Sequence, residues 1–180
     1  MEDNVIKGMI ADYESDLLGN WYTLHLSNGD APTFAIEPKN IPHLLGIRKL
    51  PLRQVQGRSA EVVYEMLRDG RVTLSHIAPH KEAYKKVMNF PHLISILHCG
   101  DAVKVVKRIG SLHSKYLLYL DHRPKEIVHL GLVEDDTGLW HPESFLVLQR
   151  NVTAYIDGQL PVDIVSMSIS DTFTNQKCNL

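Results

Sequence analysis

Four polar residues lie inside apolar segments and are the first candidates for chemistry. His43 lies in NIPHLLG and His129 lies in IVHLGL. Lys115 begins the run KYLLYL, and Ser144 follows the tripeptide HPE. Each also has a structural interpretation: a buried or capping histidine, a lysine that protects a strand edge, or a hydroxyl at a strand start. If these segments are neighbouring strands, Lys115, His129 and Ser144 can share one face of a sheet.

These residue types match the needs of RNA cleavage without a metal ion. A base removes the proton of the 2′-hydroxyl, an acid protonates the leaving 5′-oxygen, and cations or hydroxyls hold the non-bridging phosphate oxygens. Histidine suits the first two tasks because its pKa lies near neutrality. Lysine and arginine suit the third. The hypothesis requires His43, Lys115 and Ser144 to converge within roughly 10 Å on one cleft.

The sequence lacks the common metal, nucleotide and hydrolase motifs. Two cysteines far apart in the chain do not form a zinc site, and Pro79 interrupts the helix that would align His76 with His80. No GxxxxGK[ST], GxGxxG, GxSxG or HExxH segment occurs. We therefore expect no metal and no cofactor.

The charge balance limits the partners of this chain of 180 residues. Its formal net charge is −2 and its pI is about 6.5, which excludes a uniformly basic nucleic-acid binder. Positive charge is concentrated locally, because the segment 46–60 contains Arg48, Lys49, Arg53 and Arg58 and no acidic residue. This segment is either a solvated loop or an anion-binding edge.

The sequence also predicts the compartment. The first residues, MEDNVIKGMI, do not resemble a secretory signal, and no run approaches 18 apolar residues. We expect a cytoplasmic protein that does not contact a membrane.

The order of predicted elements indicates an α+β domain. Helical spacing covers residues 3–18, the second helix is capped by Ser59, and the third, over 81–97, is interrupted by Pro91. Asn28-Gly29 predicts the turn of a β-hairpin. Strand patterns then cover 103–107, 115–120, 127–133, 144–148 and 162–169. We predict N-terminal helices and the hairpin packed on a twisted antiparallel sheet of four to five strands, in a single domain over 1–169 with a polar tail over 170–180.

An ordered set of motifs runs through the chain. In order they are NIPHLLGIRKL around His43, SAEVVYEMLRDGRVTL from Ser59, KYLLYL from Lys115, HLGLV from His129, and HPESF around Ser144. This order resembles the fourth phage-associated subgroup of the Barnase–EndoU–Colicin–RelE superfamily of nuclease-like domains, over about residues 1–169. That subgroup typically shows HLLGL-x-K, a helix ending L-x-x-G-x-L-T, a K-x-D/K-Y strand, an HLGL strand and P-x-[ST]-F.

The resemblance implies an active face on the sheet and a ribonuclease or toxin activity in phage or mobile-element conflict. Its partners would be RNA, with transfer or messenger RNA as candidates, and a cognate immunity or antitoxin protein. His43 would be the general base or acid, His129 the candidate acid, Lys115 a phosphate ligand and Ser144 a hydrogen-bond donor to phosphate. The candidate substrate-binding residues are Arg48, Lys49, Arg53, Tyr116 and His141.

Two other classes of function stay open at this stage. The first is a non-catalytic phage or mobile-element binding module on the same fold, in which His43 would be buried and satisfied. The second is an enzyme that acts on a small molecule, such as an ADP-ribosyl transferase, because Glu143 stands beside Ser144.

Overall fold

The computed structural model describes residues 3–121, 126–152 and 155–171. Its helices are α1 (Asp3–Asp16), α2 (Asn40–Leu44), α3 (Ala60–Arg68), α4 (Leu74–Ile77), α5 (Lys81–Asn89) and α6 (His92–Cys99), with a 3-10 turn, η1 (Ile47–Lys49). Its strands are β1 (Trp21–Leu26), β2 (Thr33–Ala35), β3 (Asp101–Lys104), β4 (Tyr116–Leu120), β5 (Glu126–Glu134), β6 (Trp140–Gln149), β7 (Leu160–Val162) and β8 (Ile164–Ser170).

All of these strands belong to one mixed sheet that is nearly closed into a barrel. Their order is β7-β3-β4-β5-β6-β2-β1-β8, and β2 pairs with β6 in parallel through Phe34 and Trp140. The strands at the two ends of this order, β7 and β8, are separated in the chain by Asp163 alone. The chain therefore bends at Asp163 from pairing with β3 to pairing with β1.

The predicted antiparallel sheet of four to five strands is thus wrong. The hairpin of β1 and β2 forms as expected, and Gly29 has the positive φ of +85° that its turn requires. However, the hairpin joins the sheet instead of packing on it, because β2 pairs with β6. The last predicted strand, over 162–169, also divides at Asp163 between the two ends of the sheet. Both differences depend on contacts between distant segments.

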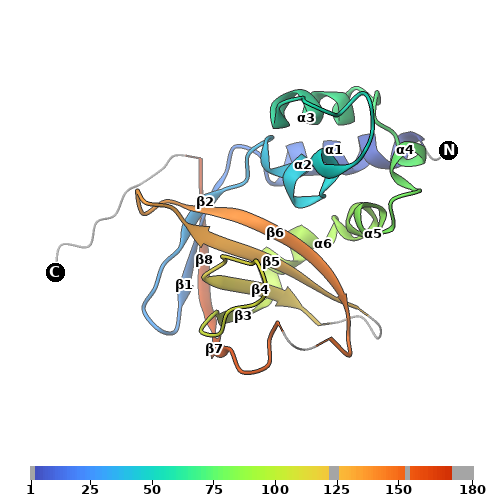
Figure 1. The fold of residues 1–180 in the computed structure, drawn as a ribbon. Coiled ribbons are helices and arrows are strands. Elements are labelled where there is room, and N and C mark those ends of the chain that lie inside the picture. The colour runs from blue at the N-terminus through green and yellow to red at the C-terminus, as the bar shows by residue number, and fades with distance from the viewer. Residues whose placement is uncertain (1–2, 122–125, 153–154, 172–180) are drawn as a thin grey trace.

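The helices form where local signals predict them. The Ser59 hydroxyl accepts a hydrogen bond from the Val62 amide at the start of α3, and Gly70 with φ +76° follows its end. Pro91 separates α5 from α6. Figure 1 shows α1 to α5 gathered on one side of the strands, while α6 leads into β3. No helix in the described ranges is long and apolar enough to cross a membrane.

The central strand β5 is buried on both faces. Val128, Leu130 and Leu132 point into the main hydrophobic core, and His129 and Gly131 therefore point to the opposite face. The register between β5 and β6 shifts after Gly131, which pairs with Ser144, whereas Leu132 pairs with Pro142. Glu143 is the extra residue of this β-bulge. Bulges redirect side chains, and this one sets the geometry of the site.

Candidate functional site

A cleft of about 660 Å³ lies between α2, α5 and β6. We call it the β6 cleft. A smaller hollow of about 420 Å³ shares His43 and Glu143 with it, so these two residues lie where the two spaces meet. Both apolar and polar side chains line the β6 cleft, and the polar ones include His43, Lys49, His80, Lys86, Glu143 and Ser144.

His43 is exposed at the end of α2, and its ring is held in one orientation. Its Nε2 lies 2.9 Å from the backbone carbonyl oxygen of Glu143. A carbonyl only accepts hydrogen bonds, so Nε2 carries the proton in the neutral ring. Nδ1 then has the lone pair, and it can accept a proton from a ligand.

The Glu143 carboxylate is fixed by the segment that enters β4. Its Oε2 accepts a hydrogen bond of 2.6 Å from the Ser114 hydroxyl. The backbone amide of His113 lies 3.1 Å from Oε1 and 3.2 Å from Oε2. These contacts hold a negative charge at the bulge, beside the carbonyl that orients His43.

Ser144 lines the β6 cleft, but its hydroxyl does not reach the cleft surface. Its Oγ is buried, and no hydrogen-bond partner for it occurs among the described residues. A Cβ atom on Gly131 would clash with the Oγ atoms of Ser114 and Ser144. Glycine at this position therefore lets both hydroxyls approach the backbone of β5.

Positive charge is concentrated on one wall of the β6 cleft. Lys86, on α5, donates a hydrogen bond of 3.2 Å to the carbonyl oxygen of Leu44, the residue after His43. Burial, and then the nearby Lys49, lower the pKa of Lys86. Lys81 lines the same wall. Three lysines and two carboxylates, Glu82 and Glu143, thus line this cleft, and the small excess of positive charge suits an anionic ligand.

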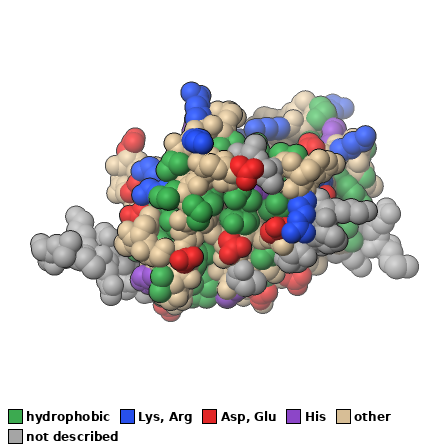
Figure 2. Space-filling model, turned by 90° about the horizontal axis from the view of Figure 1, so that it is seen from below, with side chains coloured by type: hydrophobic (Ala, Val, Ile, Leu, Met, Phe, Trp, Pro, Cys, Tyr) green, Lys and Arg blue, Asp and Glu red, His purple; other side chains and the backbone are tan. Residues whose placement is uncertain are grey.

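The face of the molecule that is seen from below is not continuously basic. Figure 2 views the molecule from below and shows apolar side chains across the middle of that face. Acidic side chains lie among them, and lysine and arginine side chains lie mostly toward the edges.

The predicted site residues separate into several places. His43, Lys49 and Ser144 line the β6 cleft, and Arg48 and His141 line the smaller hollow. Lys115 and Tyr116 line a different cleft at one end of the barrel, where Lys115 pairs with Glu134. Arg53 is exposed and lines none of these three spaces. His43, Lys115 and Ser144 therefore do not line a single cleft.

His129 is fully buried in the middle of β5. Burial lowers its pKa to about 4, although the backbone at Ile127 and Leu146 acts in the opposite direction. Its ring lies between those of Tyr119 and Tyr155, at centroid distances of 6.1 and 6.0 Å. A buried imidazole with a pKa of about 4 does not fit the predicted role of general acid, because at neutral pH it is not the imidazolium that donates a proton readily, and both of its ring nitrogens are buried.

Glu143 has only a minor part in the predictions from sequence, and Lys86 has none. The position of Glu143 depends on the bulge, which local sequence does not reveal. For Lys86 a signal exists: Ala83, Val87 and Phe90 form the buried face of α5, and Lys86 is three residues after Ala83, at the border of that face. Within the ranges that the structure describes, no three His, Cys, Asp or Glu side chains form a group suited to a metal ion.

Comparison with known proteins gives one match. A family model described as phage-Barnase-EndoU-ColicinE5/D-RelE like nuclease4 matches residues 5–169. No match was found among curated proteins or among solved structures.

Proposed function

Because the chain belongs to the phage-Barnase-EndoU-ColicinE5/D-RelE like nuclease4 family, we propose that it is a metal-independent endoribonuclease whose active site is the β6 cleft. The family supplies the class, a phage-type nuclease domain. The choice of RNA as substrate and of cleavage by the 2′-hydroxyl rests on the side chains that line the cleft.

The residues of the cleft can divide the reaction between them. Nδ1 of His43 removes the proton of the 2′-hydroxyl, and the 2′-oxygen attacks phosphorus. Lys86 gives a proton to the 5′-oxygen as the P–O5′ bond breaks, and its lowered pKa favours this transfer. Lys49 stabilises the charge on the non-bridging oxygens. The products are a 2′,3′-cyclic phosphate and a 5′-hydroxyl.

One observation carries the proposal: a continuous set of contacts ties the proposed base to the proposed acid. The Nε2–H of His43 bonds to the Glu143 carbonyl, and the Glu143 carboxylate is held by Ser114. Lys86 bonds to the carbonyl of Leu44, directly after His43. Such positioning is required before proton transfer at a single phosphate becomes efficient.

A second candidate function is a binding module that holds RNA or a partner without cleaving it. The separation of Lys115 from His43 and the burial of His129 favour this candidate, because two predicted catalytic groups are missing from the cleft. The same alternative covers docking of an immunity or antitoxin protein over the β6 cleft. The proposed setting for either function is the cytoplasm.

The decisive experiment is RNA cleavage in the presence of EDTA. We expect the wild-type protein to cut a fluorescent RNA oligonucleotide, and His43→Ala to lose about 100-fold or more in rate, the usual contribution of a general base. His98→Ala changes an exposed histidine at the end of α6 and serves as the matched control. Binding of RNA without cleavage by the wild-type protein would favour the second candidate. Equal rates for the wild-type protein and His43→Ala would refute the assignment of the site.

A further inference from the structure

A second cleft, of about 560 Å³, opens at one end of the barrel. We call it the rim cleft, because its residues come from the β1–β2 turn and from the ends of β3 to β6. The residues that matter here are Asp30, Lys104, Lys115, Tyr116, Glu134 and Trp140. Its volume lies within the range of small-ligand sites, which often occupy the mouths of barrels.

One side of the rim cleft is a fixed carboxylate. The Oδ2 atom of Asp30 accepts hydrogen bonds from Asn28 at 3.0 Å, from Lys104 at 2.9 Å and from the Tyr116 hydroxyl. The hydrogen bond from Tyr116, followed by that from Lys104, lowers the pKa of Asp30. These three bonds all use Oδ2, so Oδ1 keeps its capacity to accept a hydrogen bond from a ligand.

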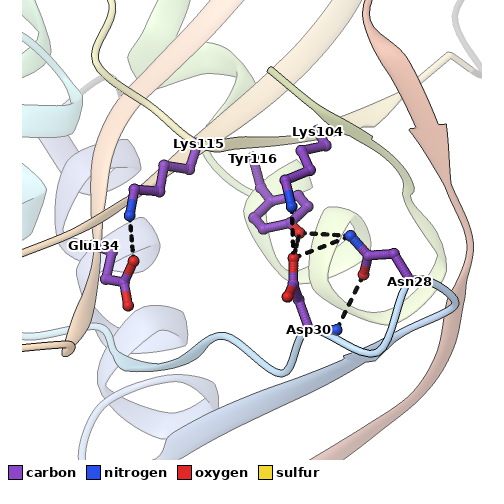
Figure 3. Close-up of polar contacts among 6 residues, drawn as sticks. All are labelled: Asn28, Asp30, Lys104, Lys115, Tyr116 and Glu134. Atoms are coloured by element: carbon purple, nitrogen blue, oxygen red, sulfur yellow. Dashed lines mark hydrogen bonds and ion pairs between the residues drawn. The ribbon is translucent and has the colours of Figure 1, made fainter. Parts of the chain in front are cut away.

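The other side is an ion pair over an aromatic ring. Lys115 pairs with Glu134, and Figure 3 shows this pair across from the Asp30 cluster. The Lys115 Nζ lies 5.6 Å from the centroid of the Trp140 ring, which is itself 5.6 Å from that of Tyr116. The Lys115 and Glu134 side chains are 53% and 31% exposed. An ion pair this exposed to solvent contributes little to the stability of the fold. A ligand can therefore compete for both groups.

The chemistry of the rim cleft fits a flat, uncharged ring with donors and acceptors on its edge. Its two carboxylates, Asp30 and Glu134, balance its two lysines, Lys104 and Lys115, so neither an anion nor a cation is favoured overall. A flat ring that displaces the Lys115 ammonium group can stack on Trp140. A nucleobase has these properties, and stacking on an aromatic side chain contributes about 1–3 kcal/mol per base.

The two clefts are neighbours. Ser114 and Lys115 are consecutive, yet Ser114 bonds to Glu143 in the β6 cleft and Lys115 pairs with Glu134 in the rim cleft. On β6, Trp140 precedes Glu143 by three residues, about 10 Å along a strand. We infer that the rim cleft binds a base of the substrate RNA next to the phosphate that is cut in the β6 cleft, an inference that rests on the proposed ribonuclease function.

Tryptophan fluorescence tests this inference without any cleavage. The chain has two tryptophans, so Trp21→Phe leaves Trp140 as the sole indole emitter. This variant is titrated with each of the four nucleoside 5′-monophosphates. We expect saturable quenching by at least one of them, and at least fivefold weaker binding after Glu134→Gln. Glu65→Gln changes an exposed carboxylate on α3 and should leave the affinity unchanged.

The outcomes separate the two proposals. Absence of saturable quenching, or quenching that Glu134→Gln does not weaken, would overturn the inference even if RNA is cleaved. Quenching that depends on Glu134, in a chain that does not cleave RNA, would support base binding and overturn the proposed function alone. If Trp21→Phe does not fold, the Trp140 indole N–H signal in the NMR spectrum of the wild-type protein reports the same binding. The base that binds most tightly should also be the base that the protein prefers next to the cleaved phosphate. A different preference would overturn the inference that the rim cleft binds the base next to that phosphate.

Discussion

The buried ring of His129 should make this protein less stable in acid. The ring is fully buried, and burial lowers its pKa to about 4 from an ordinary value of 6.5. Above pH 6.5 the ring is neutral in both the folded and the unfolded chain, so it has no effect on the pH dependence of stability. Below pH 6.5 the unfolded chain gains a proton that the folded chain does not accept. The free energy of unfolding therefore falls as the pH falls from 6.5 to about 4.

The size of the effect follows from the two pKa values. Each unit of difference corresponds to 1.36 kcal/mol. Linkage then predicts a loss of about 2 kcal/mol at pH 5 and about 3 kcal/mol at pH 4, relative to pH 7. Small domains are stable by only about 5–15 kcal/mol, so this loss should be easy to measure.

The comparison that isolates His129 is with His129→Phe. Phenylalanine keeps an aromatic ring between Tyr119 and Tyr155 but does not titrate. Urea unfolding of both proteins at pH 7, 6 and 5, followed by circular dichroism, gives the free energy of unfolding of each. Other groups that titrate are common to both proteins and cancel in the difference. We expect the difference to move by about 2 kcal/mol in favour of the variant between pH 7 and pH 5. Parallel pH profiles would refute the argument and would mean that His129 is accessible to protons in the folded state.

Three further predictions concern the two clefts. Gly131→Ala should lower the free energy of unfolding by about 1–3 kcal/mol and impair cleavage, because the new Cβ would displace two serine hydroxyls. The control is Gly8→Ala on the exposed face of α1, where a new Cβ would have no neighbour within 4 Å. Gly8→Ala should raise the free energy of unfolding by about 0.5–1 kcal/mol. Lys86→Met removes a half-buried ammonium group from the proposed site. The free energy of unfolding should stay unchanged or rise, while the cleavage rate should fall about 100-fold. An unchanged cleavage rate would exclude Lys86 as the general acid. Tyr116→Phe should cost about 1 kcal/mol and raise the pKa of Asp30 toward its ordinary value, as followed by carboxyl NMR titration, because it removes the hydrogen bond that lowers this pKa most.

Local signals were sufficient to predict most individual elements. The Ser59 cap, the break at Pro91 and the Asn28-Gly29 turn each act over a few residues, and each is present in the structure. The assembly of these elements could not be predicted in the same way. Strand β2 has three residues and pairs with β6 through a single register position, at Phe34, so its place in the sheet depends on distant packing.

The candidate site was predictable in part for a related reason. Residue type and motif indicated His43, Lys49 and Ser144, which do line one cleft. Residue type does not reveal which cleft a residue near a strand end will line. Ser114 bonds to Glu143 in the β6 cleft, whereas the next two residues, Lys115 and Tyr116, line the rim cleft.

The most direct test of the central proposal is the chemistry of the cut ends. A DNA oligonucleotide that contains one ribonucleotide is incubated with the protein in the presence of EDTA, and the masses of the products are measured by mass spectrometry. Attack by the 2′-hydroxyl predicts a single cut after the ribonucleotide, with a 2′,3′-cyclic phosphate on one product and a 5′-hydroxyl on the other, and no cut in the all-DNA control. Cleavage of the all-DNA oligonucleotide, or products with a 5′-phosphate, would contradict the proposal.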